Sequence, residues 1–175
     1  TAHATILVDC QGERSSVTFP GTFPACAGWL PLEAVSAAGA VIVDHRWPEG
    51  AERLLATAAA RRLPRVLDAD LGAPDTVRRL VPLADHAIFS RDALAEFTGH
   101  GDPQHGLRAV PREEGDVAAV TLGDCGSLFL AGGEIHHVQT MAISARDTTG
   151  CGDVFHGAYA LALAEGASIL EAARF

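Results

Sequence analysis

Short apolar runs alternate with segments of helical spacing three times between residues 39 and 99, and this alternation constrains the fold more than any other feature. The runs are AVIVD, RVLDAD and DHAIFS, which end at Asp44, Asp70 and Ser90. Each run is followed by apolar residues three and four positions apart, the spacing of an amphipathic helix. Such strands joined by helices predict a mainly parallel sheet with helices on its faces, an α/β/α sandwich of three layers.

The segments on either side of this alternation predict antiparallel strands. Residues 4–19 contain two β-rich runs joined at Gln11–Gly12, which indicates a hairpin. A polar stretch at 101–116 is interpreted as a loop or an irregular helix. Three more short strands are predicted at 117–123, 127–131 and 134–138. The last two are joined by Gly132–Gly133, so the parallel sheet gains an antiparallel edge.

The sequence TTGCGD, residues 148–153, precedes a helical pattern that is predicted to begin at about Asp153 and to end at Glu165. Glycine at 150 and 152 lets the backbone turn tightly and approach a phosphate without a Cβ in the way. The N–H groups of this turn can then converge on anionic oxygens, because a helix start favours negative charge. Spacing alone does not decide between a catalytic anion site and a plain helix entry capped by the aspartate.

The composition narrows the classes of function. The 175 residues suffice for one α/β domain, and a net charge of -9 argues against a nucleic-acid or anionic-membrane surface. The 13 basic residues are all arginine and asparagine is absent, so a Walker P-loop, a Schiff-base lysine and an N-glycosylation site are excluded. No apolar run reaches the roughly 20 residues of a membrane span, and no signal peptide is recognisable. We therefore expect a cytoplasmic protein with a small-molecule partner.

Two rival interpretations of the glycine motif are weaker. A GxGxxG dinucleotide fingerprint starting at Gly150 requires glycine at position 155, where Phe155 stands. Cys151 at a helix start, with His156 further along, is conceivable as a catalytic thiol, but a histidine on a helix face is more often a surface or groove residue. The cysteines show no CxxC pair and no metal-ligand spacing, which favours reduced thiols.

The segment DTTGCGDVFHGAYA, residues 147–160, resembles the second signature of the ribokinase/PfkB family of sugar kinases, in which D-T-x-G-A-G-D precedes an apolar helix. Two further segments agree in order and spacing. ILVDCQGERSSV is similar to the family's lid strands, and VTLGDCGSLFL to its strand and turn beside the nucleotide. The resemblance implies a ribokinase-like fold, with a β-hairpin lid at 1–22 and an α/β core at 23–175. The family's N-terminal sugar ligands and C-terminal adenine-pocket helix are missing, so we expect an incomplete copy.

The resemblance implies a kinase that transfers the γ-phosphate of ATP to a sugar hydroxyl, and it assigns roles to matching positions. The base is Asp153, and the anion hole is formed by Gly150, Cys151 and Gly152. The nucleotide-binding positions are Thr121, Gly123, Gly126 and Ser90. Asp147 and the backbone of Thr149 match positions at which some members hold a monovalent cation, so K⁺ joins ATP and Mg²⁺ as an expected cofactor.

Two positions depart from the family's pattern. Cys151 replaces the usual alanine, which keeps the side chain small and the backbone N–H available. The family's N-x-x-E element, which organises Mg²⁺ and phosphate through water, falls at residues 90–93 and reads SRDA. We therefore do not transfer the metal-organising role to Asp92.

The substrate is indicated by VDHRWPEGAERL, residues 43–54, which is most similar to the ketohexokinase and sulfofructose-kinase branch. Arg46, at a strand end near the expected sugar cleft, can pair bidentately with a sulfonate or phosphate; the alternative is an ordinary salt-bridged surface arginine. A ketose, with or without a sulfonate, is the expected substrate. A nucleoside or vitamin kinase on the same fold and a non-catalytic sugar- or nucleotide-binding protein stay open as alternatives.

The lid hairpin suggests a further partner. Apolar residues recur along its two strands, and they are Ile6, Val8, Val17 and Phe19. Such a face is expected to close over the sugar or to pair with a second copy of the chain in a homodimer.

Overall fold

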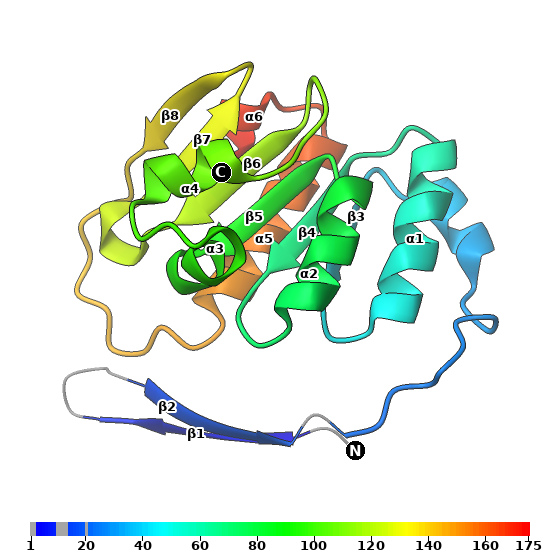
Figure 1. Ribbon diagram of the computed structural model, residues 1–175, viewed down its shortest axis with the longest axis horizontal. Helices are drawn as coiled ribbons and strands as arrows, with labels where there is room; N and C mark the ends of the chain where they lie inside the picture. Colours follow the sequence, from blue (N-terminus) through cyan, green and yellow to red (C-terminus); the bar gives the residue numbers. More distant parts are fainter. Residues whose placement is uncertain (1–2, 10–13, 20) are drawn as a thin grey trace.

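The computed structural model describes residues 3–9, 14–19 and 21–175. The strands are β1 His3–Val8, β2 Arg14–Phe19, β3 Val41–Asp44, β4 Arg65–Ala69, β5 His86–Ser90, β6 Val117–Thr121, β7 Ser127–Ala131 and β8 Glu134–Val138 (Figure 1). The helices are α1 Pro48–Ala60, α2 Pro74–Leu80, α3 Arg91–Thr98, α4 Pro103–Ala109, α5 Cys151–Ala164 and α6 Ile169–Ala172. The predicted turn at Gln11–Gly12 lies outside the described residues.

Strands β3 to β8 form one sheet in which the spatial order follows the sequence. Neighbours from β3 to β6 are parallel, whereas β7 and β8 are each antiparallel to the strand before them. The prediction of a mainly parallel sheet with an antiparallel edge is therefore confirmed. The register between β5 and β6 sets Ser90 beside Thr121 at the carboxyl edge of the sheet.

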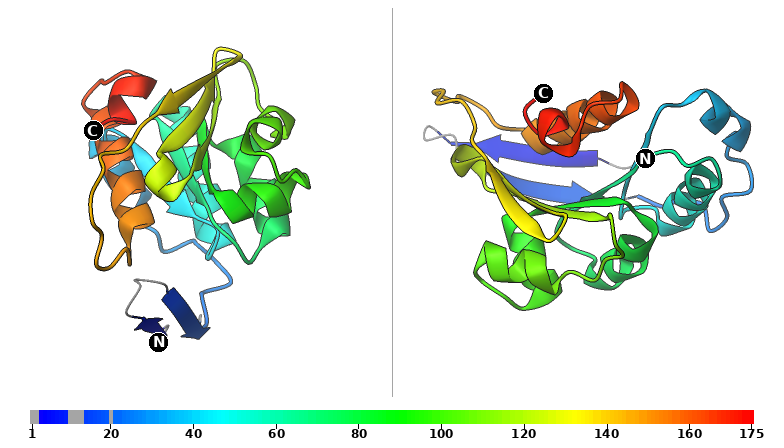
Figure 2. Two further views of the ribbon diagram at one scale, coloured as in Figure 1. Left: turned by 90° about the vertical axis from the view of Figure 1, so that its left-hand side faces the viewer. Right: turned by 90° about the horizontal axis from the view of Figure 1, so that it is seen from above.

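Helices cover both faces of this sheet, as the two views of Figure 2 show. Helices α1 to α4 pack on one face, and α5 with α6 packs on the other. Successive residues of β4 serve the two cores: Leu67 belongs to the first and Val66 to the second, and both are fully buried. Strands covered on both sides are apolar at nearly every position, which explains the continuous runs in the sequence. The three-layer prediction is confirmed.

Two helix boundaries differ from the sequence interpretation. The segment interpreted as a loop or irregular helix contains a regular helix, α4, whose start is capped by Asp102 accepting a 2.8 Å hydrogen bond from the N–H of His105. Helix α5 begins at Cys151, earlier than predicted, because Gly150 adopts a left-handed conformation (φ 75°) and serves as its N-cap. Asp153 consequently lies inside the first turn, and the prediction that it caps the helix is wrong.

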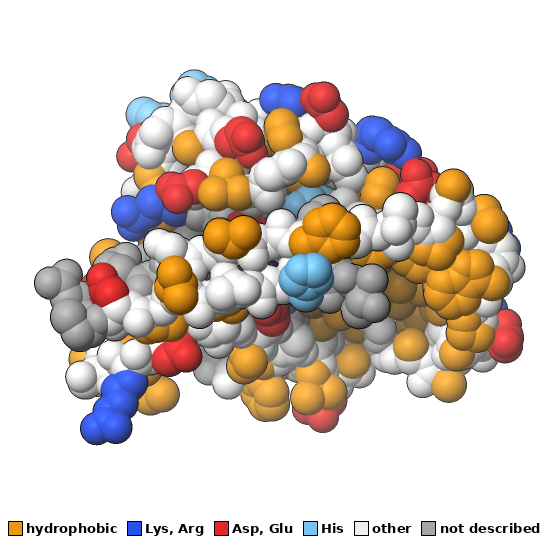
Figure 3. Space-filling model, turned by 90° about the horizontal axis from the view of Figure 1, so that it is seen from below, with side chains coloured by type: hydrophobic (Ala, Val, Ile, Leu, Met, Phe, Trp, Pro, Cys, Tyr) orange, Lys and Arg blue, Asp and Glu red, His pale blue; other side chains and the backbone are white. Residues whose placement is uncertain are grey.

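Strands β1 and β2 form a separate antiparallel sheet, with His3 opposite Phe19 and Thr5 opposite Val17. Because side chains alternate along a strand, Val17 and Phe19 lie on one face and Ile6 and Val8 on the other, so the prediction of a single apolar face of these four residues is wrong. This sheet lies beyond the carboxyl ends of the parallel strands (Figure 1), and it occupies the foreground of the face shown in Figure 3. Its described side chains are exposed, including the apolar ones. None of the helices in the described part of the chain combines the length and apolar character that a membrane span requires.

Candidate active site

The carboxyl ends of four parallel strands bring polar residues to one edge of the sheet. Asp44 ends β3, Asp68 lies near the end of β4, Ser90 ends β5 and Thr121 ends β6. Helix α5 begins at the same edge (Figure 1). Ligands of open parallel sheets bind here, because helix N-termini direct free N–H groups and partial positive charge toward this edge.

The glycine turn before α5 forms a compact backbone loop. The N–H of Thr149 donates to Oδ1 of Asp147 at 2.8 Å, and the N–H of Cys151 donates to the carbonyl of Thr148 at 3.2 Å. The next two N–H groups, of Gly152 and Asp153, lie in the first turn, where a helix offers them no acceptor. No atom lies within 4 Å of the position that a Cβ of Gly152 would take.

The predicted anion hole is therefore assembled in part. Gly150, Cys151 and Gly152 lie together at the start of α5, beside Asp153, but the N–H of Cys151 is engaged by its own turn. A ligand oxygen approaching the open side of Gly152 would meet the remaining N–H donors of this turn. The geometry suits an anion, and Asp153 lies exposed in the same helical turn.

Three carboxylates come close to one another at this edge, from β4, the residue after it and α5. Burial raises the pKa of Asp68, and the nearby negative charges of Asp70 and Asp153 raise it further, whereas His156 and Arg46 oppose the shift. Sequence reasoning missed Asp68, Asp70 and His156 as site residues. The D-x-D spacing at a strand end is the signal that could have found the first two. His156 is interpreted from its place on a helix face as a surface or groove residue.

Arg46 lies at the same edge but is paired with Asp44. Its Nη1 donates to Oδ2 of Asp44 at 3.0 Å, and its backbone N–H donates to Oδ1 at 2.9 Å. This hydrogen bond raises the pKa of Arg46 above its ordinary value. The side chain is about half exposed (51%), so part of its guanidinium faces solvent. The salt-bridged alternative is thus the state observed, and a substrate role stays a prediction.

Ser90 connects two strand ends. Its Oγ donates to Oδ1 of Asp70 at 2.9 Å and accepts from the N–H of Ala93 at 3.4 Å, which caps α3. In this chain Ala93 is buried and Asp92 is exposed. The carboxylate nearest Ser90 therefore comes from the end of β4 rather than from α3.

The other predicted nucleotide residues lie around the turn from β6 to β7. Thr121 is half-buried, and its hydroxyl donates to the carbonyl of Phe89 at 3.4 Å. Gly123 (φ 62°) has open space where a Cβ would be. Gly126 (φ 82°) differs, because a Cβ there would clash with the carbonyl oxygen of Val138. Its lack of a side chain is required by the turn itself, whatever it does for a nucleotide.

The chemistry of this edge fits a magnesium ion carried by a phosphate. Mg²⁺ prefers oxygen ligands and is often held by one or two carboxylates plus substrate phosphates. Asp70 and Asp153 supply such carboxylates. Within residues 3–9, 14–19 and 21–175, no three His, Cys, Asp or Glu side chains are grouped as a complete metal site. The monovalent-cation role of Asp147 and Thr149 stays a prediction.

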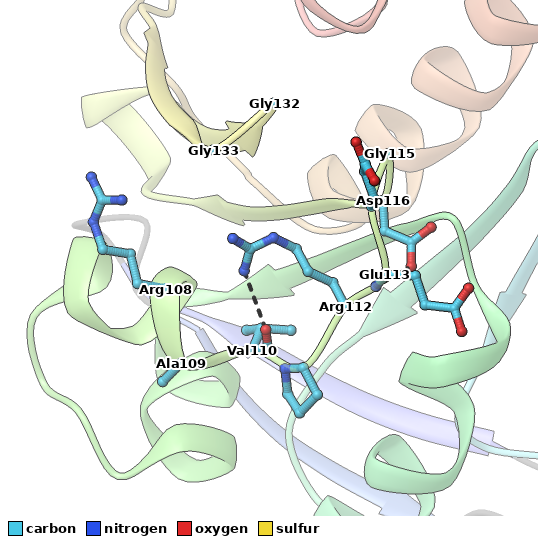
Figure 4. Close-up of a pocket in the computed structure, with 11 residues that line it drawn as sticks. Arg108, Ala109, Val110, Arg112, Glu113, Gly115, Asp116, Gly132 and Gly133 are labelled. Atoms are coloured by element: carbon cyan, nitrogen blue, oxygen red, sulfur yellow. Dashed lines mark hydrogen bonds between the residues drawn. The ribbon is translucent and has the colours of Figure 1, made fainter.

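A cavity of about 640 Å³ lies away from these residues, at the opposite edge of the sheet. Figure 4 shows it between the end of α4, the loop before β6 and the hairpin tip at Gly132 and Gly133. Arg112 points into it and donates to the carbonyl of Val110 at 3.3 Å. Its remaining charged walls are of both signs, and none of the predicted site residues lines it. We therefore place the candidate active site at the carboxyl edge.

Comparisons with known proteins identify the family of the chain. The model of the pfkB family carbohydrate kinases matches residues 1–175. A ribokinase of Arabidopsis thaliana is 28% identical over 194 residues, which cover the whole chain and 49% of that protein. The chain thus spans about half the length of the curated relatives it matches.

Solved structures of ribokinases and related proteins are also similar to this chain. A protein of Agrobacterium tumefaciens described as a candidate ribokinase is 34% identical, with a TM-score of 0.86 over 99% of this chain and 58% of that chain. The ribokinase of Arabidopsis thaliana, solved with ribose and ATP, is 24% identical, with a TM-score of 0.75 over 99% of this chain and 60% of that chain. The latter likeness concerns the fold.

Proposed function

Because this chain belongs to the pfkB family of carbohydrate kinases and has their ribokinase-like fold, we propose that it forms the phosphoryl-transfer part of an ATP-dependent sugar kinase. The observation that carries the proposal is the first turn of α5. It combines the exposed carboxylate of Asp153 with the open backbone of Gly152 at the carboxyl edge of the sheet. A base and an anion-binding turn are the two parts that transfer to an alcohol needs.

In the proposed reaction, a sugar hydroxyl attacks the γ-phosphorus of ATP. The new bond joins the hydroxyl oxygen to phosphorus, the bond to the β-phosphate oxygen breaks, and ADP leaves. The proton of the hydroxyl passes to Asp153, which suffices as a weak base because the proton leaves late in a loose transition state. The N–H groups of Gly152 and of the neighbouring residues stabilise charge on the transferred group. Asp70 and Asp153 would hold Mg²⁺ brought by ATP, and the ion would neutralise phosphate charge.

The nucleotide is proposed to run along the turn after β6. Thr121 adjoins Ser90 across the β5–β6 register, and Gly123 leaves open space above its backbone. These features allow phosphates to pass close to the main chain between the turn and α5. K⁺ beside Asp147 and Thr149 is proposed as a further cofactor, on the family resemblance alone.

The proposed substrate is a ketose or a related small sugar, with a sulfonated ketose as its most specific form. This proposal is supported by Arg46, which lies at the carboxyl edge of the sheet with part of its guanidinium exposed. Asp44 uses one face of the guanidinium, and the five N–H donors of arginine leave others for an oxyanion. An Arg46→Gln variant should lose turnover of a sulfonated ketose while keeping that of a neutral ketose. Equal losses on both sugars would remove Arg46 from substrate recognition.

The sheet of β1 and β2 is proposed to cover the sugar and to contact a second copy of the chain. Leu7, Val17 and Phe19 share one face of this sheet and are 65%, 76% and 55% exposed, and contiguous exposed apolar side chains often mark an interaction surface. A Val17→Glu variant should therefore lower the mass found by light scattering if copies pair through this sheet. A wild type that is monomeric at every concentration would contradict the pairing.

The decisive experiment measures ADP release by the full-length protein with a panel of acceptors. The panel contains ribose, fructose, a sulfonated fructose, a nucleoside and an alcohol-bearing vitamin. Asp153→Asn should lower kcat by about 10²- to 10⁴-fold on the preferred acceptor, the usual contribution of a general base. Asp92→Asn is the matched control, because Asp92 is also exposed in the first turn of a helix. Equal background release by wild type and Asp153→Asn on every acceptor would favour a non-catalytic binding protein.

A further inference from the structure

His156 is buried against β4 although it is a polar residue of α5. It is only 4% exposed, and its Nδ1 lies 2.7 Å from the carbonyl oxygen of Gly152, one turn earlier in the helix. A carbonyl oxygen can only accept a hydrogen bond, so Nδ1 carries a proton and donates it. The ring orientation and tautomer of His156 are thereby fixed by the first turn of α5.

The other ring nitrogen faces a carboxylate on the neighbouring strand. Nε2 of His156 lies 3.6 Å from Oδ1 of Asp68 and is a buried nitrogen with no hydrogen-bond partner. The side chain of Asp68 is itself only 17% exposed. The separation is an ion-pair distance rather than a hydrogen bond. The ring of His156 therefore contacts the sheet at Asp68, near the end of β4.

This pair is connected to the candidate base through the helix. His156 is three residues after Asp153, so the two lie on one face of α5. The Nδ1 bond holds Gly152, the residue before Asp153, and the Asp68 contact ties the same ring to β4. We propose that His156, through its Nδ1 bond to the carbonyl of Gly152 and the contact of its Nε2 with Asp68, positions the first turn of α5, with Asp153 and the N–H of Gly152, against the sheet.

The inference rests on the proposed kinase function for its kinetic consequence only. Asp153 and the anion-binding N–H groups share a turn, so a displacement of about 1 Å would misplace both relative to the transferred phosphate, which costs about 100-fold in related situations. His156 and Asp68 are thus positioning residues. Their loss should lower kcat more than it weakens ATP binding, because the proposed nucleotide path also includes the turn after β6.

Two substitutions of His156 separate its two contacts. His156→Asn keeps an amide nitrogen near the place of Nδ1 but cannot reach Asp68, whereas His156→Gln reaches toward Asp68 but loses the bond to Gly152. Each should lower kcat by about 10- to 100-fold with the KM for ATP changed less than about threefold. His105→Gln is the matched control, because His105 forms an exposed pair with Asp102 at 3.5 Å. Wild-type kcat in both His156 variants would overturn the positioning role.

Nitrogen NMR of the full-length protein tests the contacts of His156 with Gly152 and Asp68 without any turnover. Nδ1 of His156 should appear protonated, and the Nε2 signal should shift in Asp68→Asn but not in the control Asp92→Asn. An Nε2 signal that is unchanged in Asp68→Asn would overturn the inference, even in an active kinase. A shifted signal in a protein that phosphorylates no acceptor would support the pair while refuting the proposed kinase function, so the two failures are distinguishable.

Discussion

Oγ of Ser90 donates a 2.9 Å hydrogen bond to Oδ1 of Asp70, which joins the carboxyl ends of β5 and β4 beside the candidate active site. The same hydroxyl caps α3 by accepting from the N–H of Ala93. One side chain therefore fixes a helix start and a carboxylate. Helix α3 presents Ala93 at the position where the N-x-x-E pattern has glutamate, so the carboxylate bonded to Ser90 is that of Asp70.

Ser90→Ala should lower the free energy of unfolding by about 1–2 kcal/mol, since it removes a helix cap and a partly buried hydrogen bond together. Urea denaturation measures this loss. Ser36→Ala is the control, because the hydroxyl of Ser36 makes only an exposed bond to the carbonyl of Glu33, and its effect should stay within about 0.5 kcal/mol. A Ser90→Ala variant as stable as the control would show that neither bond contributes.

Gly152→Val should leave the fold intact and remove phosphate binding. A Cβ at this position meets no atom within 4 Å, and valine tolerates helical backbone at least as well as glycine does. The branched side chain would nevertheless fill the space through which phosphate oxygens approach the N–H groups. Calorimetric titration with ATP and a thermal melt check both parts. Unchanged ATP affinity and turnover would contradict the anion-binding role of this turn.

Gly150→Ala, unlike Gly152→Val, should lower the free energy of unfolding. Gly150 holds φ at 75°, and a left-handed conformation costs a residue with a Cβ about 1–2 kcal/mol, although a Cβ there would only make an ordinary contact, at 3.8 Å, with Oδ2 of Asp153. The variant should unfold at lower urea concentration than Gly152→Ala. Equal midpoints would show that the helix start can adopt another conformation.

Gly126→Ala should be among the most destabilising substitutions of a surface turn in this chain. Its φ is 82°, and an added Cβ would clash with the carbonyl oxygen of Val138, which belongs to the backbone and cannot rotate away. We expect a loss of about 2 kcal/mol or more, against about 1 kcal/mol for Gly123→Ala, where only the positive φ is strained. Urea denaturation of both variants ranks them, and the opposite ranking would contradict the assignment of Gly126 to the turn.

His86 makes the stability depend on pH. Nδ1 of His86 lies 2.9 Å from the hydroxyl of Tyr159, and burial lowers the pKa of this histidine below its ordinary 6.5, against the raising effect of Asp85 and Asp116. The unfolded chain therefore takes up a proton as the pH falls below about 6.5, whereas the folded chain does so only at lower pH. The free energy of unfolding therefore decreases as the pH is lowered through this range. The difference between the urea midpoints at about pH 7 and at about pH 5 should be smaller in His86→Gln than in wild type. Equal differences would mean that other groups cause the loss.

The sequence predicted the sheet, its antiparallel edge and most helices, because strands buried on both faces and helices of regular spacing leave patterns within a few residues. Helix α4 was left open as a loop or irregular helix, although Asp102 followed by Pro103 is a strong helix start. The glycines of residues 101–116 favour a loop and so make this helix start harder to recognise. The start of α5 was misplaced for the opposite reason: Asp153 is a good capping residue, but a left-handed glycine performs the capping.

The candidate site was predictable only where its residues are consecutive. The turn at 147–153 is one local structure, so its residue types indicate its geometry. Asp68 and His156 approach each other because α5 crosses the sheet over β4, and neither segment carries a mark of that crossing. The sequence offers a salt-bridged Arg46 only as an alternative and names no partner for it, since a polar residue two positions away, here Asp44, can turn to a ligand or to the arginine.

Substitution of Gly50 tests whether the packing of Trp47 influences Arg46 at the carboxyl edge of the sheet. Trp47 stacks on Trp29 with ring centroids 5.4 Å apart, donates from Nε1 to the carbonyl of Pro24 at 2.9 Å and covers Gly50, where an added Cβ would overlap its ring. Gly50→Ala should displace this ring and destabilise the fold by about 1–3 kcal/mol, the usual cost of overpacking.

These two tryptophans are the only ones in the chain, so near-ultraviolet circular dichroism reports their stacking directly. The signal should change in Gly50→Ala and persist in Gly28→Ala, because a Cβ at Gly28 meets no atom within 4 Å. Arg46 precedes Trp47, so a displaced ring should also lower turnover of a sulfonated ketose more than that of a neutral one. A changed signal with unchanged sugar preference would separate the tryptophan stack from substrate recognition, and an unchanged signal would contradict the packing itself.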